Sequence, residues 1–233
     1  MKAKSLIIVF ILPLLFGFAA YKSLPNSDDT PVALVKKIIK NVTYKKAGQD
    51  DWATARTGLP LVNGEEVKTG SNSLALILFT DGSGLLKVQP NSILKVYGEF
   101  ENKKINKNTF IDKGSVGFDV NKQEDEEFKF TTPTAVASVR GTEGLFEVAD
   151  NGESVMVLKS GSVELQTKTG KKVTLTAGNT AVFDLEGNAT VAPSTEDDKK
   201  RLGQATTLTT RKVIMKTNTG DEIIIEYFSG DNK

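Results

Sequence analysis

Residues 131–148 read Thr131-Thr-Pro-Thr-Ala-Val-Ala-Ser-Val-Arg-Gly-Thr-Glu-Gly-Leu-Phe-Glu-Val148. Two apolar runs flank a break that is formed by Arg140 and the segment Gly141-Thr-Glu-Gly144. Because glycine adopts backbone conformations that residues with a Cβ avoid, this pattern predicts a strand, a tight corner and a second strand. Arg140 places a full charge at the corner, where we expect it to pair with Glu143 or another carboxylate. Contact with a ligand is the alternative role for Arg140.

Turn signals punctuate the rest of the chain at regular intervals. Asn63-Gly64, Asp81-Gly82 and Asn151-Gly152 are strong signals for hairpin turns. Residues 74–79, Leu-Ala-Leu-Ile-Leu-Phe, are apolar at every position, which predicts a central strand that is covered on both faces. No segment between residues 45 and 195 has a helical period, so the sequence predicts an all-β domain.

A short motif occurs twice. Lys113-Gly-Ser-Val116 is similar to Lys159-Ser-Gly-Ser-Val163. Two such copies indicate equivalent corners in stacked layers of short strands. A β-solenoid-like stack and a two-sheet sandwich both fit this pattern, and both architectures remain open at this point.

Several segments have two interpretations or read as loops. Ile38–Tyr44 is β-branched and aromatic, which predicts a strand, with a helix over Leu34–Lys40 as the alternative. The basic segment Glu101–Asn108 and the acidic segment Gln123–Glu127 are predicted to be solvated loops. Residues 193–201 are highly charged and predict either a linker or the start of a short helix.

The N-terminus has the pattern of an export segment. Lys2 and Lys4 precede a run of apolar or small residues from Leu6 to Ala20. This pattern is typical of a signal peptide, with cleavage expected before Ala20, and an uncleaved membrane anchor is the alternative. We therefore expect a periplasmic protein, anchored in the inner membrane by residues 5–21 if the segment is retained.

The C-terminus reads as a β-hairpin with unusually apolar strands. Residues 212–217 and 222–228 flank a turn at Asn218-Thr-Gly-Asp221. An isolated hairpin is only marginally stable in water, so we expect it to dock on the main domain or, alternatively, on another chain. The predicted partner-docking strand presents Ile223, Ile225 and Tyr227.

The sequence thus divides into five parts. They are residues 1–20 as a signal peptide or N-terminal membrane anchor, 21–31 as a linker, 32–192 as the all-β domain, 193–211 as a charged linker, and 212–233 as the C-terminal hairpin and tail.

Composition excludes several classes of function. The 233 residues include no histidine and no cysteine, which removes Ser-His-Asp and Cys-His catalysis and the usual zinc ligands. A net charge of +1 gives no electrostatic basis for binding nucleic acid. Asp81-Gly-Ser83 reads as a hairpin tip rather than a site, and Trp52 as a packed core or edge residue rather than a sugar platform. We expect no enzyme, no metal and no cofactor.

Residues 131–148 also resemble a family signature. Thr132–Glu143 is similar to the signature of the FecR domain, an extracytoplasmic module of bacterial cell-surface signalling proteins. Further matching segments extend the resemblance over residues 32–185. They are Trp52-Ala-Thr-Ala, Gly58-Leu-Pro-Leu, Gly64-Glu-Glu-Val-Lys-Thr-Gly70, Asp81-Gly-Ser83, Pro90-Asn-Ser92, Val155–Val163 and Leu175-Thr-Ala-Gly178. Where the family usually has a glycine, this chain has Asn41.

The resemblance implies a role in signal reception. FecR-type proteins receive a signal from an outer-membrane receptor and pass it to a sigma factor through a cytoplasmic segment, which we expect this chain to lack. We therefore expect a non-catalytic binding or sensing module that contacts an envelope protein or polymer, with Arg140, Gly141, Thr142 and Glu143 as the candidate contact. A structural envelope protein that forms a homo-oligomer through the C-terminal hairpin is the alternative. Contact with a membrane is expected only through the N-terminal segment.

Overall fold

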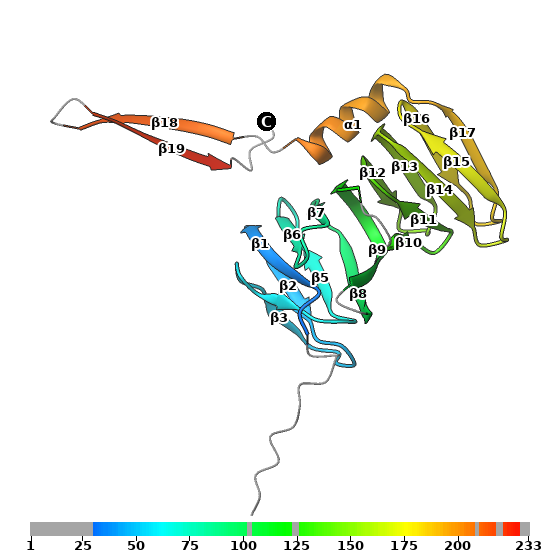
Figure 1. The fold of residues 1–233 in the computed structure, drawn as a ribbon, viewed down its shortest axis with the longest axis horizontal. Coiled ribbons are helices and arrows are strands. Elements are labelled where there is room, and N and C mark those ends of the chain that lie inside the picture. Colours follow the sequence, from blue (N-terminus) through cyan, green and yellow to red (C-terminus); the bar gives the residue numbers. More distant parts are fainter. Residues whose placement is uncertain (1–29, 102–103, 123–125, 208–209, 218–220, 229–233) are drawn as a thin grey trace, which may run out of the picture.

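The computed structural model describes residues 30–101, 104–122, 126–207, 210–217 and 221–228 (Figure 1). Within these ranges the chain forms nineteen strands and one helix. Seventeen strands build two sheets, here called sheet A and sheet B, and the last two strands form a separate hairpin. The predicted all-β fold with a C-terminal hairpin is confirmed. The predicted signal or anchor segment lies outside the described residues.

The two sheets share one long strand. Sheet A runs, neighbour by neighbour, through β4 (Pro60–Leu61), β1 (Ala33–Ile39), β6 (Leu74–Phe79), β7 (Gly84–Val88), the second half of β9 (Lys104–Val120), β12 (Thr142–Val148), β13 (Ser154–Ser160), β16 (Asn179–Phe183) and β17 (Ala189–Pro193). Sheet B runs through β3 (Trp52–Thr54), β2 (Val42–Lys45), β5 (Glu66–Thr69), β8 (Ile93–Glu101), the first half of β9, β10 (Phe128–Thr131), β11 (Ala135–Val139), β14 (Ser162–Thr167) and β15 (Lys172–Thr176). The chain alternates between the sheets, so the architecture is a two-sheet sandwich built in layers.

Phenylalanine side chains fill the middle of the sandwich. Phe79 and Phe128 meet edge to face with their ring centroids 4.8 Å apart, and Phe118 lies at the same distance from Phe130. Phe146 extends the cluster from β12. Each of these side chains is fully buried or nearly so, and burial of one such side chain stabilises the fold by about 1.5–3 kcal/mol. As predicted, β6 is a central strand, with β1 and β7 on either side.

The repeated motif marks places where the chain crosses between sheets. Gly114 lies where β9 leaves sheet B for sheet A, and Gly161 lies between β13 of sheet A and β14 of sheet B. Both glycines have positive φ angles, 93° and 83°. The predicted equivalence of the two corners is therefore confirmed.

Two expectations about the strands need correction. Ile38–Tyr44 is not one strand, because Lys40 has a φ of 58° and β1 and β2 on either side belong to different sheets. Glu101–Asn108 is not a loop, because its described residues continue β8 and β9, which pair directly with each other. In the first segment the β-branched residues concealed the corner at Lys40, and in the second a polar composition concealed the strand pattern.

The charged segment after residue 193 contains helix α1 (Glu196–Thr206). Thr195 and Asp198 form a capping box at its N-terminus, which satisfies backbone N–H groups that the helix leaves free. Leu202 and Ala205 pack on Leu145 and Val157, on the outer face of sheet A. The last turn approaches so closely that a Cβ at Gly117 would lie 2.2 Å from the Ala205 carbonyl oxygen.

A lysine from sheet A binds the C-terminal end of α1. The Lys87 ammonium group donates to the carbonyl oxygens of Gln204 and Thr207. The last turn of α1 contains no basic residue of its own. Lys87 therefore supplies the positive charge that stabilises a helix C-terminus, although burial lowers the pKa of its ammonium group.

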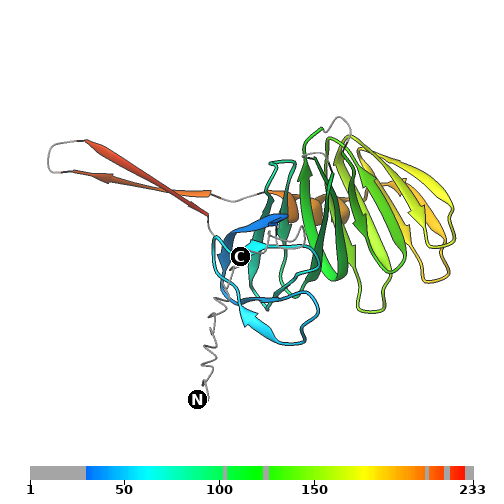
Figure 2. The ribbon, with the colours of Figure 1, turned by 60° about the horizontal axis from the view of Figure 1, so that its bottom comes forward.

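The hairpin formed by β18 (Thr210–Lys216) and β19 (Glu222–Phe228) extends away from the sandwich (Figures 1 and 2). It therefore does not dock on the main domain, which was the first expectation. Ile214 and Ile224 are 57% and 54% exposed. Among the described residues, no helix is long and apolar enough to cross a membrane.

Candidate functional site

The Arg140 corner connects β11 of sheet B to β12 of sheet A. Gly141 has a φ of 65°, and its N–H donates to the Asn121 carbonyl at 3.3 Å. The side chain of Arg140 is exposed. The sequence therefore places a cation at a position that the backbone of two sheets holds in place.

The β13–β14 corner at Gly161 packs directly against the Arg140 corner. A Cβ at Gly161 would lie 2.7 Å from the Gly141 carbonyl oxygen and 2.6 Å from Thr142 Cγ2. The Glu143 N–H also donates to Ser160 Oγ at 3.2 Å. These contacts stack the β13–β14 crossing on the Arg140 corner, so the corner has little freedom to move.

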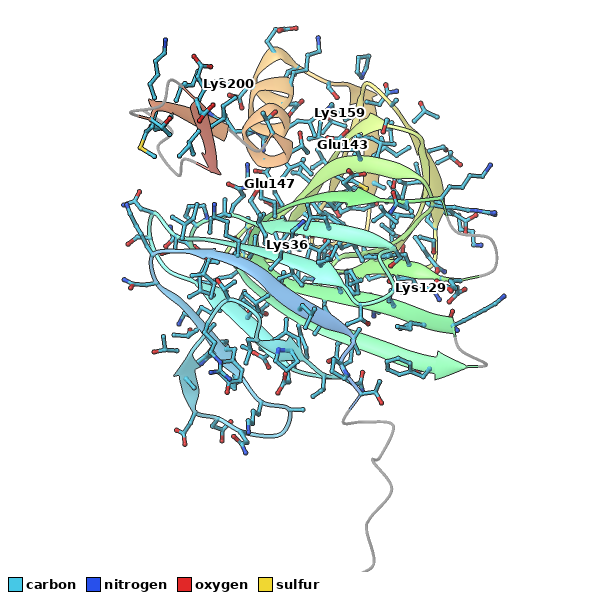
Figure 3. All side chains as sticks on the ribbon, turned by 60° about the vertical axis from the view of Figure 1, so that its left-hand side comes forward. Lys36, Lys129, Glu143, Glu147, Lys159 and Lys200 are labelled. Atoms are coloured by element: carbon cyan, nitrogen blue, oxygen red, sulfur yellow. The ribbon has the colours of Figure 1, made fainter. Side chains whose placement is uncertain are left out.

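Glu143 does not pair with Arg140, contrary to the expectation from the sequence. The Glu143 carboxylate accepts from the Lys159 ammonium group at 2.8 Å, and both residues lie on the outer face of sheet A (Figure 3). Lys159 is on β13, which is paired with β12, and it precedes Ser160, the residue opposite Glu143. Within the described part of the chain, Arg140 has no ion-pair partner.

The other two corner residues are buried or closely packed. Thr142 is buried, and its Oγ1 atom has no hydrogen-bond partner among the described residues. Gly144 has no unusual φ, but a Cβ there would lie 2.6 Å from the Phe118 ring and 2.7 Å from the Val157 carbonyl oxygen. Gly144 is thus required by space rather than by backbone conformation. Of the four candidate contact residues, Arg140, Gly141 and Glu143 reach the surface.

Three cations, Arg140, Lys122 and Lys159, outnumber the two carboxylates near the corner, Glu143 and the exposed Asp119 opposite it. Lys122 lies against Gly141, since a Cβ on that glycine would be 3.3 Å from Lys122 Cβ. Lys122 and Lys159 are both exposed, as Arg140 is. Glu143 neutralises one of these cations through its ion pair. The surface therefore suits a partner group that carries negative charge.

The second candidate site lies on the hairpin, well away from β12 in Figures 1 and 2. In the hairpin register Ile223 is opposite Met215, Ile225 opposite Val213 and Tyr227 opposite Arg211. Because side chains alternate along a strand, positions 223, 225 and 227 belong to one face. Ile223 is exposed; the side chains of residues 225 and 227 lie outside the described part of the structure.

One charged residue that the sequence did not reveal is buried in the sandwich. Lys107 on β9 has a side-chain exposure of 0% and forms ion pairs with Asp81 and Glu126. Alternation along 105–111 places Ile105, Lys107 and Thr109 inward, a pattern that could have been found had the segment been read as a strand. Burial alone would raise the pKa of Asp81, but hydrogen bonds from Lys107 and Ser83 outweigh it and hold that pKa below its usual value.

The remaining sequence candidates are structural. Asp81 accepts from the Ser83 N–H at 2.9 Å in the turn between β6 and β7, as expected of a hairpin tip. Trp52 lies on edge strand β3, with the ammonium groups of Lys45 and Lys68 at 5.1 and 5.5 Å from its ring centroid. No cluster of three or more metal-ligating side chains occurs within the described ranges.

Comparison with solved structures identifies the fold. Two crystal structures of a candidate anti-sigma factor from Parabacteroides distasonis ATCC 8503, at 2.50 and 1.65 Å resolution, each match with a TM-score of 0.50. Sequence identity is 13% and 14%, and each match covers 58% of this chain. The chain spans 62% of the length of these proteins, which is less than two thirds.

The sequence comparisons agree with the fold. A search of curated proteins gave no match. The family model described as FecR protein matches residues 65–164, which include most of β5 to β14 and the whole Arg140 corner. The resemblance to the FecR signature was inferred over residues 32–185, and the matched range lies within it. The chain therefore carries a match to the FecR family over residues 65–164.

Proposed function

We propose that this chain is a non-catalytic binding module of bacterial cell-envelope signalling, which acts outside the cytoplasmic membrane. Its FecR domain and its likeness to a candidate anti-sigma factor support a regulatory role. The basic start and apolar run of residues 1–20 support export. The absence of histidine and cysteine from the sequence supports binding rather than catalysis.

The observation that carries this proposal is the state of Arg140. Its neighbouring carboxylate is engaged by Lys159, while the guanidinium group is exposed and has no ion-pair partner within the described ranges. A guanidinium group presents several N–H donors in a fixed plane, which suits a carboxylate on a partner protein. The stacked corners hold its backbone in place before binding, which lowers the entropy lost on association.

Capture from intact cells tests the role of Arg140. We expect cross-linking to recover an envelope partner with the wild-type protein and at least about tenfold less of it with Arg140→Ala, which corresponds to about 1.4 kcal/mol. Lys200→Ala is the matched control, because Lys200 is an exposed cation on α1 (Figure 3). An unchanged set of partners in the Arg140 variant would show that the corner is not the contact.

The hairpin supports a second candidate function, a self-assembling envelope scaffold. Ile214, Met215 and Ile224 are all exposed at levels rare for such side chains. Both edges of a two-stranded hairpin also carry unpaired backbone groups, which can accept a strand from another chain. A second copy of the hairpin that pairs along one edge would satisfy the unpaired backbone groups of that edge.

The charges on the hairpin favour one way of joining two copies. Lys212 is opposite Glu226, and Lys216 is opposite Glu222, in the observed register. The edge of β18 from one copy against β19 of another can repeat these attractive pairs. Pairing β19 with β19 would instead place Glu222 opposite Glu226, which is repulsive.

A charge exchange tests this assembly. The variant Lys212→Glu, Lys216→Glu, Glu222→Lys and Glu226→Lys keeps attractive pairs within its own hairpin but presents repulsive pairs to the wild type. When differently tagged copies are mixed, we expect wild type to co-purify with wild type and variant with variant, but not one with the other. If the wild-type protein stays monomeric, or if it co-purifies with the variant, the proposed scaffold function is wrong.

A further inference from the structure

A polar groove of about 370 Å³ crosses the outer face of sheet B, away from both candidate sites. Two rows of side chains line it across β8, β9 and the start of β10. In the first row Tyr97 of β8 is opposite Asn108 of β9, and Asn108 is opposite Lys129 of β10. In the second row Glu99 of β8 is opposite Asn106 of β9. Glu127 comes directly before β10. Its volume is within the range of about 300–1,000 Å³ that is usual for ligand sites.

Three asparagines hold their amide groups in fixed orientations around this groove. The oxygen of each one accepts a hydrogen bond from the protein: Asn63 from the Gly98 N–H at 3.1 Å, Asn106 from the Glu127 N–H at 3.1 Å, and Asn108 from Thr131 Oγ1 at 2.9 Å. Among the described residues, nothing accepts a hydrogen bond from the three Nδ2 groups. The groove thus carries amide donors that are oriented and free to bind a ligand.

The remaining groups of the groove define the chemistry of that ligand. Glu99 and Glu127 are exposed carboxylates that can accept hydrogen bonds from hydroxyl groups, and Lys129 pairs with Glu127. The half-buried ring of Tyr97 offers an apolar face for C–H groups. Two carboxylates would repel a phosphate backbone. The groove lies on a sheet face rather than at an edge, so it offers no backbone ladder to a peptide strand.

A second hollow extends the groove toward the first strands of the sandwich. It has a volume of about 700 Å³, and its lining includes Tyr44, Gln49 and Arg56. Asn63 lines both hollows. The two therefore form one track, which suits a chain of repeating units better than a single small molecule.

We propose that this track binds a neutral glycan chain, with Tyr97 as the platform and Asn63, Asn106 and Asn108 as donors to its oxygen atoms. The glycan track deepens the proposed binding role, on which it rests, by naming an envelope polysaccharide as one ligand. It is separate from the Arg140 corner, which meets the partner protein.

An array of neutral and acidic glycans, probed with the full chain, tests this proposal, with titration calorimetry on each glycan that binds. We expect neutral oligosaccharides to bind, and Asn106→Ala with Asn108→Ala to weaken their affinity about tenfold or more. Tyr97→Ala should weaken the affinity for these oligosaccharides to a similar extent, although it leaves the three asparagine side chains in place. Gln166→Ala, which removes an exposed amide from the same sheet outside the track, should leave affinity unchanged.

Three results would overturn the proposal: an array without hits, hits confined to charged polymers, or affinity that the Asn106, Asn108 and Tyr97 variants leave unchanged. Melting curves of each variant separate lost binding from lost folding. If the array is empty while Arg140-dependent capture persists, the glycan track alone is wrong. If glycans bind but Arg140→Ala captures the same partners as wild type, only the corner is wrong.

Discussion

Replacement of Gly114 by alanine is expected to destabilise the sandwich by more than about 3 kcal/mol and to leave little folded protein. Gly114 has a φ of 93°, a region in which a residue with a Cβ is strained. A Cβ there would lie 2.3 Å from Ser92 Oγ and 2.5 Å from Ser92 Cα. The Ser92 backbone is part of the turn that leads into β8, so it cannot move aside without breaking the pairing of β8 with β9.

Gly178→Ala is the matched control for this prediction. Gly178 also lies where the chain crosses between sheets, from β15 to β16, and has a φ of 80°. No atom lies within 4 Å of a Cβ at that position. Urea denaturation should therefore show only the backbone strain, about 1–2 kcal/mol. Equal losses in the two variants would mean that the contact between Ser92 and Gly114 is not what holds the bend of β9.

Replacement of Lys107 by alanine is expected to cost about 3 kcal/mol of folding free energy. Removal of one partner from a buried ion pair leaves the other charge without compensation, an effect of about 3–5 kcal/mol. Asp81 and Glu126 retain some contact with solvent, with side chains 20% and 23% exposed, which places the loss near the lower end. Lys129→Ala is the control, because its pair with Glu127 is exposed and should contribute less than about 1 kcal/mol.

The same ion pair predicts a dependence of stability on pH. The pKa of Asp81 is lowered in the folded state, so its charged form stabilises the fold above the unfolded pKa of about 3.9. This contribution is lost as the pH falls through the lower folded-state value. Urea denaturation of the wild type between pH 6 and pH 3 should show the onset of this loss, and Lys107→Ala should show less of it. A variant with the same pH profile as the wild type would argue against the pairing.

The fold class followed from local signals. Glycine-containing turns and short alternating runs predicted strands throughout, and the repeated Lys-Gly-Ser-Val motif predicted equivalent corners. What local signals could not predict was a 17-residue strand shared by two sheets. The bend at Gly114 depends on close contact with Ser92, which is distant in sequence. The sequence of β9 alone therefore does not predict that contact.

The sequence predicted where the Arg140 corner lies, but it did not predict the ion-pair partner of Glu143. The charge at Arg140 and the left-handed glycine beside it are local features that the sequence shows directly. The partner of Glu143 comes from β13, and it can be known only once β12 and β13 are in register. Lys107 was missed for a related reason, because its basic neighbours suggested a solvated loop.

Hydrogen–deuterium exchange of the full chain, with and without the captured partner, tests most directly whether a rigid corner makes the contact. We expect exchange at residues 139–143 to slow when the partner is bound, with the core strands of both sheets unchanged. Protection confined to other surfaces, with residues 139–143 exchanging as in the free protein, would contradict the proposed function.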